Sequence, residues 1–321
     1  MAQLARAVEF TAPGQCRVVE VPVGRPGDGE VVVAAECSLI SAGTEGLLYR
    51  GEVEADVPLD ASLPALGGRV RWPVRYGYAV AGRIEDSGEA VFAFHPHQSR
   101  FVVRREDLVP IGPHLSHDAA VFLPQVETAL SLIMDAGVLP GERVAVVGLG
   151  VVGLLATALL NRIVGVEVVG IDPVDCRRER ALDLGAAETR HPEEAAGLDA
   201  DLVFEVSGRP EALETAVAAC GDEGRVVVGS WYGTRRATLG FGTHFHRGRI
   251  ALLSSQVSRI APRLSGRWTP ARRLALALRL LSELPVASLV THRVPIERAA
   301  QAYEAIVRGD PERLAVLIRY T

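Results

Sequence analysis

The sequence contains no lysine, because all 34 of its basic residues are arginine. A lysine Schiff base and a lysine general base are therefore excluded from its chemistry. Any anionic group must instead be held by guanidinium groups, whose planar fork suits carboxylates and phosphates. The absence thus limits the covalent chemistry that is open to the protein and favours recognition of anions by arginine.

Cysteines and long apolar runs are also scarce. The four cysteines are scattered and form no C-x-x-C pair, so neither a zinc ribbon nor a thioredoxin-like site is indicated. Residues 1–10 show no charged segment followed by an apolar core, which a signal peptide would have. No run reaches the ~18 apolar residues of a membrane span. We therefore expect a cytoplasmic protein that does not bind a membrane. The cysteines are Cys16, Cys37, Cys176 and Cys220.

Size and charge narrow the class further. The chain has 321 residues, which predicts about two domains. Its composition, 48% hydrophobic and 23% charged, is typical of a soluble globular protein. The net charge of −5 gives no reason to expect nucleic acid as a partner.

The most informative stretch is Arg143–Leu160. A β-branched run, Val144–Val147, is followed by G-x-G-x-x-G at Gly148, Gly150 and Gly153, and then by a Leu/Ala helix. In a dinucleotide site these three glycines allow a tight turn, close approach of a pyrophosphate, and close packing of helix on strand, respectively. The helix N-terminus adds free N–H groups and a positive dipole end. The stretch predicts a nucleotide-binding loop.

A second apolar run, Val166–Ile171, ends in Asp172. The interval from Gly150 is 172 − 150 = 22 residues, close to the ~20 expected for an acid that binds a ribose hydroxyl. Because an aspartate here repels a 2′-phosphate, NAD(H) is favoured, while Arg177 and Arg178 keep NADP(H) open. The alternative interpretation is an ordinary β-α turn that binds nothing.

The full set predicted to bind the cofactor includes polar residues and glycines at the ends of later strands, where the ligand crevice of such a sheet lies. It comprises Gly148, Gly150, Val151, Val152, Gly153, Asp172, Arg177, Ser207, Gly229 and Ser254.

Residues 1 to about 110 contain short β-like runs separated by turn residues, and predict an all-β module, a small partly open barrel. From Ser116 the chain becomes helical, with a helix over Val126–Ala136. The predicted strands are Ala5–Phe10, Cys16–Val21, Glu30–Glu36, Gly77–Glu85, Ala90–Phe94 and Arg100–Arg104.

Strands and helices then alternate, which predicts a doubly wound parallel sheet in an α/β domain. The strands fall at 144–147, 166–171, 201–206, 225–229 and 249–253, and the helices at 151–161, 175–184 and 210–219. A helix over 270–284, a strand over 289–294, a helix over 296–308 and a strand over 314–320 complete the chain.

Several stretches, taken together, resemble the medium-chain dehydrogenase/reductase superfamily of the alcohol dehydrogenase type over essentially the whole chain. Ser38–Glu45 further resembles a subgroup that includes the bacteriochlorophyllide hydroxyethyl dehydrogenases and the dehydrogenase halves of some two-domain sugar-pathway oxidoreductases. The stretches that carry the broader resemblance are Gly27–Val33, Gly137–Val144, Ala181–Ala186, Asp201–Gly208 and Gly224–Gly229.

This resemblance implies a Rossmann doubly wound parallel sheet plus a GroES-like β-barrel catalytic domain. The catalytic domain would comprise residues 1–122 and 259–321, and the dinucleotide-binding domain residues 123–258. The active site would lie in the cleft between them. We also expect a homodimer.

The chain departs from the zinc-dependent members of the family at all three ligand positions. The corresponding stretches read Ala42-Gly-Thr-Glu45 and Gly77-Tyr-Ala79, with the third near Leu123-Pro-Gln125. None offers a thiolate or an imidazole, whereas a catalytic zinc needs about three protein ligands. The four-cysteine structural zinc lobe is missing too. We therefore expect a zinc-independent member and no metal site.

Without a metal, side chains or ordered water must handle the proton that accompanies hydride transfer. The resemblance places Thr44 where zinc members keep a relay hydroxyl, and Tyr78 where they keep a zinc-binding histidine. Glu45 is either a base or an anchor for an arginine, and His95 is a candidate acid/base because its pKa needs little shift. The alternatives are a turn hydroxyl for Thr44 and a packed aromatic for Tyr78.

Two further patterns have two interpretations each. His95-Pro-His97 and His244-Phe-His246 would each share one face of a strand, which suits a metal, but no third ligand is evident. Arg69, Arg71 and Arg75 either bind a carboxylate or phosphate of an anionic substrate or form a solvated basic strand.

The sequence thus predicts an NAD(H)-dependent oxidoreductase that interconverts a secondary alcohol and a ketone, with a small-molecule substrate. One alternative is an NADPH-dependent ene or quinone reductase of the same fold. Another is a nucleotide-binding protein without turnover, such as a redox sensor or scaffold.

Overall fold

The computed structural model describes residues 3–60 and 62–320. The chain divides into two compact units. The first unit comprises residues 1–124 and 281–321, and the second comprises residues 125–280.

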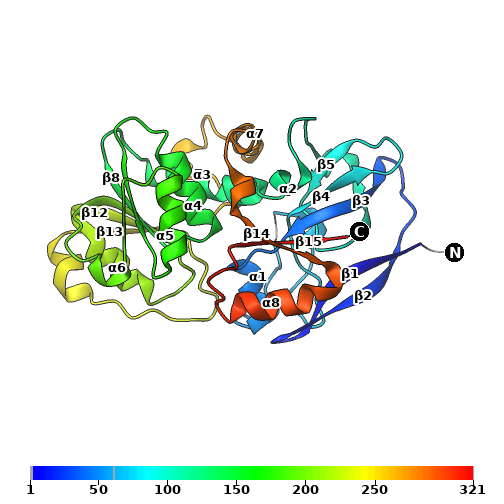
Figure 1. Cartoon of the computed structure of the whole chain (residues 1–321), viewed down its shortest axis with the longest axis horizontal. Coiled ribbons are helices and arrows are strands. Elements are labelled where there is room, and N and C mark those ends of the chain that lie inside the picture. The colour runs from blue at the N-terminus through cyan, green and yellow to red at the C-terminus, as the bar shows by residue number, and fades with distance from the viewer. Residues whose placement is uncertain (1–2, 61, 321) are drawn as a thin grey trace. The chain divides into compact units, whose positions relative to one another are not determined.

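The second unit is built on one six-stranded sheet in which all strands are parallel (Figure 1). The order β10-β9-β8-β11-β12-β13 corresponds to 3-2-1-4-5-6 along the unit, the doubly wound order of a Rossmann fold. The predicted parallel sheet is confirmed. The strands are β8 (Arg143–Val147), β9 (Glu167–Ile171), β10 (Glu188–Arg190), β11 (Ala200–Glu205), β12 (Cys220–Val228) and β13 (Ala251–Ser254).

Helices cover this sheet. Helices α4 and α5 pack against each other and against β9, and α6 packs against β8, β11 and β12. Helix α6 ends at residue 219, where the predicted helix ends, because Cys220 already pairs with Ala200 of β11. The helices are α3 (Leu123–Ala136), α4 (Val151–Leu160), α5 (Asp175–Asp183), α6 (Ala212–Ala219) and α7 (Pro270–Leu281).

The first unit carries a mixed seven-stranded sheet of order β14-β15-β3-β4-β5-β7, with β6 paired to β3, and a separate β1–β2 pair. Each strand predicted in the N-terminal 110 residues is present, with somewhat different ends. The strands are β1 (Gln3–Ala12), β2 (Gln15–Val23), β3 (Glu30–Leu39), β4 (Val80–Ile84), β5 (Ala90–Ala93), β6 (Arg100–Arg104), β7 (Val109–Pro110), β14 (Val290–Pro295) and β15 (Ala315–Arg319).

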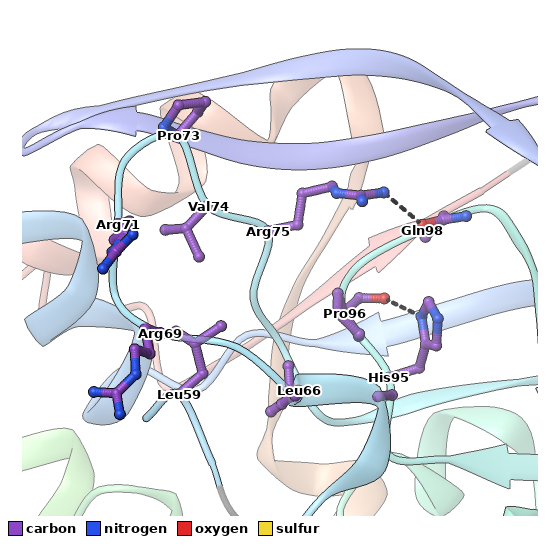
Figure 2. A pocket seen from close by; sticks show the side chains of 12 residues that line it. Leu59, Leu66, Arg69, Arg71, Pro73, Val74, Arg75, His95, Pro96 and Gln98 are labelled. Carbon is purple, nitrogen blue, oxygen red and sulfur yellow. Dashed lines mark hydrogen bonds between the residues drawn. The ribbon is translucent and has the colours of Figure 1, made fainter. Parts of the chain in front are cut away.

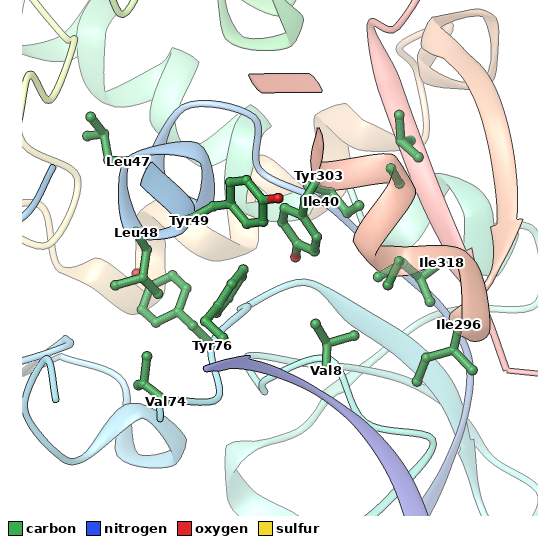
Figure 3. Close-up of a cluster of buried hydrophobic side chains, with 14 of the residues drawn as sticks. Val8, Ile40, Leu47, Leu48, Tyr49, Val74, Tyr76, Ile296, Tyr303 and Ile318 are labelled. Carbon is green, nitrogen blue, oxygen red and sulfur yellow. The ribbon is translucent and has the colours of Figure 1, made fainter. Parts of the chain in front are cut away.

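The prediction of an all-β N-terminal module was wrong at α1 (Thr44–Arg50). This seven-residue helix contains Gly46 and is too short to be stable alone. Tertiary burial stabilises it, because Leu47, Leu48 and Tyr49 lie in a hydrophobic core cluster of the unit (Figure 3).

Helix α8 (Ala299–Val307) completes that core. Tyr303 is fully buried, stacks on Tyr49 with ring centroids 5.8 Å apart, and meets Phe10 edge-on at 5.0 Å. Aromatic pairs of this geometry add to the free energy gained from burial alone. The core therefore fixes α1, whose first residues carry two of the predicted catalytic side chains.

Shorter helical segments complete the description: α2 (His117–Ala120), 3-10 turns at Pro64–Leu66, Arg105–Asp107, Pro192–Glu194, Pro262–Leu264, Val286–Leu289 and Ile296–Arg298, and a π-helical turn at Phe241–Phe245. In the described residues, His117–Ala136 is long and apolar enough to cross a membrane by length and composition alone. Of that window 72% is buried inside the structure, as in the core helix of a globular protein.

Candidate functional site

The glycine loop lies between β8 and α4, and its three glycines differ in what surrounds them. Gly148 has a φ of +99°, and a Cβ there would lie 2.4 Å from Ser207 Cα. A Cβ on Gly153 would lie 1.9 Å from the carbonyl oxygen of Gly148. By contrast, a Cβ on Gly150 would meet nothing within 4 Å. The fold itself requires Gly148 and Gly153, whereas Gly150 leaves open space of the kind that a pyrophosphate would occupy.

Helix α4 starts directly behind this open space. Gly150 is its N-cap and accepts a hydrogen bond from the Leu154 amide at 2.9 Å. Val151 and Val152 form the first turn, so their N–H groups have no partner within the helix. Such amides, together with the positive end of the helix dipole, bind phosphate groups. The loop therefore fits a dinucleotide by its own geometry.

Asp172 follows β9 and is 4% exposed. One carboxylate oxygen accepts a hydrogen bond from the Leu149 amide at 2.8 Å and the other accepts from the Val174 amide at 2.9 Å. Arg177 Nη1 lies 4.0 Å from the carboxylate, and Arg178 donates to the Asp172 carbonyl at 2.6 Å. The acid is thus joined to the glycine loop, with two arginines at its side.

Glu205 ends β11 and is fully buried. Its carboxylate accepts hydrogen bonds from the Ser207 amide at 2.9 Å, from the Ser207 hydroxyl and from the Tyr232 hydroxyl. Burial, followed by the charge of Glu205, raises the pKa of Tyr232. Sequence reasoning missed Glu205 and Tyr232, although Glu205 lies two residues before the predicted Ser207.

The remaining cofactor candidates lie on neighbouring strand ends. The Gly229 amide donates to the Glu205 carbonyl at 2.9 Å, and a Cβ there would lie 2.6 Å from a Leu132 methyl. Ser254 is the last residue of β13 and is exposed. Because carboxyl ends of parallel strands meet at one edge, these residues and the glycine loop lie along the same edge of the sheet.

In the first unit, Tyr78 and α1 form a second set of candidates. The partly buried Tyr78 hydroxyl donates to Ser41 Oγ at 2.6 Å. Burial raises the pKa of Tyr78 to about 12, against the lowering effect of its hydrogen bonds with Ser41 and Thr44. The hydroxyl groups of Tyr78, Thr44 and Ser41 therefore form one cluster. The sequence predicted Tyr78 and Thr44 as site residues but not Ser41.

Glu45 lies behind this cluster and is completely buried. It accepts hydrogen bonds from the Ser41 amide at 2.9 Å, from His97 Nε2 at 2.9 Å and from the Tyr303 hydroxyl. His97 Nδ1 lies 2.7 Å from Ser38 Oγ. The carboxylate thus joins α1, α8 and the 95–98 segment, and it fixes the position of Ser41.

Neither His95 nor His97 lies in a strand, so the strand alternation that was expected to put them on one face is absent. The His95 ring stacks on Phe101, with centroids 3.7 Å apart, and its Nδ1 lies 2.9 Å from the Pro96 carbonyl. Burial, the largest cause, lowers the pKa of His95 to about 4.

The second H-x-H pair is not in a strand either. His244 lies in the π-helical turn and its Nε2 lies 2.8 Å from the Cys220 carbonyl. Across residues 3–60 and 62–320, no three or more His, Cys, Asp or Glu side chains gather in a way that could hold a metal ion.

Two buried side chains that the sequence left unassigned lie on α3. Glu127 is buried and pairs with Arg273 Nε at 3.1 Å. Gln125 is 5% exposed, and neither polar atom of its amide has a hydrogen-bond partner in the described chain. Buried unpaired amides are rare in native proteins, so Gln125 is a candidate to contact a ligand.

Known proteins resemble the chain along its whole length. Residues 151–275 match the family model described as zinc-binding dehydrogenase. A 2-desacetyl-2-hydroxyethyl bacteriochlorophyllide A dehydrogenase from Cereibacter sphaeroides is 25% identical, with 97% of each chain covered. That relative belongs to the subgroup which Ser38–Glu45 resembles.

Solved structures share the fold. A short chain alcohol dehydrogenase from E. coli in complex with NADH superposes with a TM-score of 0.78 at 17% identity, covering 99% of both chains. A Sinorhizobium meliloti protein bound to NADP gives a TM-score of 0.76 at 19% identity, covering 99% of this chain and 100% of that one. The predicted combination of a Rossmann sheet with a GroES-like domain is confirmed.

Proposed function

The chain belongs to the medium-chain dehydrogenase/reductase superfamily, and we propose that it interconverts a ketone and a secondary alcohol with NAD(H), without zinc. The dehydrogenase relative and the solved neighbours bound to NADH and NADP support an oxidoreductase that uses NAD(P)(H). The finer assignment is carried by one observation: the Tyr78 hydroxyl, bonded to Ser41 at 2.6 Å, stands where zinc-dependent relatives are expected to have a histidine ligand.

The cofactor would be held by the glycine loop and Asp172. When bound, NAD(P)H supplies the hydride. The open space at Gly150 and the first-turn amides of Val151 and Val152 suit its pyrophosphate. Asp172 supports NAD(H) over NADP(H), because a second negative charge beside a buried carboxylate is unfavourable. Arg177, 4.0 Å away, offsets part of that repulsion.

The residues of the first unit would handle the proton. Because burial raises the pKa of Tyr78 to about 12, the phenol stays protonated at neutral pH. A protonated phenol can donate to the oxygen of a carbonyl as negative charge develops there, since an alkoxide is the stronger base. In our proposal Tyr78 is the donor, and Ser41 and Thr44 orient it.

In this proposal Glu45 is a positioning residue for Ser41. Its buried carboxylate holds the Ser41 amide, His97 and Tyr303, so it fixes the acceptor of the Tyr78 hydroxyl without touching a substrate. His95, with its pKa lowered to about 4, is neutral at pH 7 and would act as a hydrogen-bonding group rather than as an acid.

The donor set supports a zinc-independent reaction. The three stretches that resemble zinc-ligand positions read Ala42-Gly-Thr-Glu45, Gly77-Tyr-Ala79 and Leu123-Pro-Gln125. The Glu45 carboxylate already accepts from three donors, and the Tyr78 hydroxyl is bonded to Ser41. These groups do not form the three-ligand set that a catalytic zinc requires.

The decisive experiment follows NADH and NADPH oxidation with a panel of ketones and enones, with products identified by NMR. We expect secondary alcohols, faster turnover with NADH, and unchanged rates after metal removal by a chelator. Loss of activity that zinc restores would overturn the zinc-independent assignment. Saturated ketones formed from enones would support the ene reductase instead, and NADH binding without any turnover would support a non-catalytic protein.

We further propose that the protein acts as a homodimer in the cytoplasm. Strand β13 ends the six-stranded sheet, its outer edge has no strand partner among the described residues, and Leu252 and Leu253 are 37% and 43% exposed. Such an edge favours pairing with a second chain. The four free cysteines are consistent with a reducing compartment.

A further inference from the structure

A hollow of about 310 Å³ lies in the first unit, at the lower end of the size range of small-molecule pockets. We call it the arginine hollow. It is lined by Leu59 and by residues of three segments of the unit, 65–67, 69–75 and 95–98 (Figure 2). Its charged and polar side chains are those of Arg69, Arg71, Arg75, His95 and Gln98.

Backbone pairing holds the walls of the hollow in place. Val74 exchanges two hydrogen bonds with Phe10 of β1, at 2.8 and 2.9 Å, and Arg69 forms a β-bridge with Pro58. Leu66 and Val74 are buried in the core of the unit. Because its walls are part of the folded unit, the hollow exists without a ligand and a ligand would not need to order it.

Positive charge exceeds negative charge around the hollow. Arg69 and Arg71 share one carboxylate, that of Asp56, at 3.9 and 2.7 Å. Arg75 has no carboxylate partner in the part of the chain that the structure describes. Asp60, the nearest acid in sequence to the lining, binds the Ser62 amide and hydroxyl. The charges of three guanidinium groups are therefore set against one carboxylate, that of Asp56, which pairs with Arg69 and Arg71.

The guanidinium of Arg75 is oriented by Gln98. The Gln98 amide donates from Nε2 to the Arg100 carbonyl at 2.7 Å, which turns its Oε1 toward Arg75 at 3.4 Å. Figure 2 shows Arg75 reaching toward Gln98, whereas Arg69 and Arg71 lie at the opposite end of the hollow. A guanidinium has five N–H donors, so most of those of Arg75 stay available.

We propose that the arginine hollow binds a small organic anion, a carboxylate or a phosphate monoester, through Arg75, with Arg69 and Arg71 adding to the attractive field. A planar guanidinium binds the two oxygens of such a group side by side, which gives both affinity and orientation. His95 adds no positive charge to the hollow at neutral pH, because burial lowers its pKa to about 4. The proposal concerns binding and does not depend on the oxidoreductase assignment.

The test is a calorimetric titration of the full-length protein with inorganic phosphate and with succinate, at constant ionic strength set with chloride. We expect saturable binding in the millimolar range and a loss of affinity of about tenfold or more in Arg75→Gln. Arg75→Lys should fall between the two, because it keeps the charge and loses the fork.

Arg17→Gln is the matched control, because Arg17 is exposed on β2, pairs with Glu9, and lies outside the hollow. It makes the same change in net charge and should leave the affinity unchanged. An equal loss of affinity in Arg17→Gln and Arg75→Gln would show that only the net charge matters, and it would overturn the site. The absence of saturable binding in the wild type would also overturn it. Near-ultraviolet circular dichroism of Arg75→Gln and Arg75→Lys verifies folding.

Turnover assays distinguish two sources of the anion. Inhibition by succinate that is competitive with a carbonyl substrate would assign the hollow to an acidic group of the substrate itself. A succinate effect that leaves the KM for that substrate unchanged would assign it to a separate effector. The titration needs no turnover, so its failure is distinct from a failure of the proposed reaction.

Discussion

His97 Nε2 donates to the Glu45 carboxylate at 2.9 Å, and both side chains are completely excluded from solvent. The two residues are 52 positions apart, in α1 and in the segment after β5. Removal of one partner from such a pair leaves the other buried and unpaired, which is the costly case.

We therefore expect Glu45→Ala to lower the free energy of unfolding by roughly 3–5 kcal/mol, and Glu45→Gln by less, since the amide keeps an acceptor. Urea unfolding with an unchanged m-value measures both. Glu304→Gln, on the exposed face of α8, is the control and should stay within about 0.5 kcal/mol of wild type. A Glu45→Gln protein of normal stability whose kcat falls over a hundredfold would contradict a positioning role and favour proton transfer by Glu45.

Tyr78→Phe tests the proton donor. The change removes one hydroxyl and its 2.6 Å bond to Ser41. We expect kcat for ketone reduction to fall by roughly 10²–10⁴-fold, with an unchanged dissociation constant for NADH. Because the pKa of Tyr78 is raised to about 12, the wild-type reduction rate should not fall through loss of this proton below about pH 10. Wild-type rates in Tyr78→Phe would eliminate the phenol as donor.

Gly150 and Gly153 make a matched pair for the cofactor loop. Gly153→Ala would place a Cβ 1.9 Å from the Gly148 oxygen, so it should lower stability by roughly 1–3 kcal/mol. Gly150→Ala meets open space at a φ of −74°, so the protein should keep its Tm. Its affinity for NADH, followed by fluorescence, should nevertheless fall by about tenfold or more, since the methyl group occupies the space of the pyrophosphate. Unchanged NADH binding in Gly150→Ala would place the pyrophosphate elsewhere.

Stability should fall in mild acid because of His95. The pKa of His95 is lowered to about 4 in the folded protein, mainly by burial, from about 6.5 in the unfolded chain. The unfolded state thus binds the proton first, and stability present above pH 6.5 is lost as pH falls toward 4, by about 3 kcal/mol at most. In His95→Gln this part of the loss should disappear, whereas in the control His114→Gln, at an exposed position, it should remain. Urea midpoints at pH 7, 5.5 and 4.5 provide the comparison.

The dimer proposal predicts an apparent mass of twice 34.3 kDa by light scattering. Leu253→Glu puts a charge on the open edge strand and should yield monomers. Leu139→Glu, at another exposed leucine of the same unit, should stay dimeric. A wild-type monomer at micromolar concentration would remove the proposal.

The features that the sequence predicts well are those encoded by neighbouring residues. Gly148, Gly150 and Gly153 lie within six positions, and their spacing and flanking strand and helix predict the loop geometry that the structure contains. The alternation of strand and helix patterns likewise predicts the doubly wound parallel sheet. These signals need no knowledge of distant contacts.

Long-range partners were not predictable in the same way. Tyr303 reaches Glu45 across 258 positions, and no local pattern distinguishes it from an ordinary helix tyrosine. The helix α1 has only seven residues, one of them Gly46, so it has little propensity signal, and it forms because its leucines are buried. Glu127 was left unassigned because its partner, Arg273, is 146 positions away.

The hydrogen bond from the Leu149 amide to Asp172 has one more consequence. Exchange of that amide with deuterated solvent requires the contact to open, so its rate reports how often the loop and the acid separate. A pyrophosphate on the loop and a ribose on Asp172 would both slow this exchange. Each of them would stabilise one side of the contact between the loop and Asp172, and the other side would be held in place with it. The two ends of the nucleotide would be bound as a single cooperative unit.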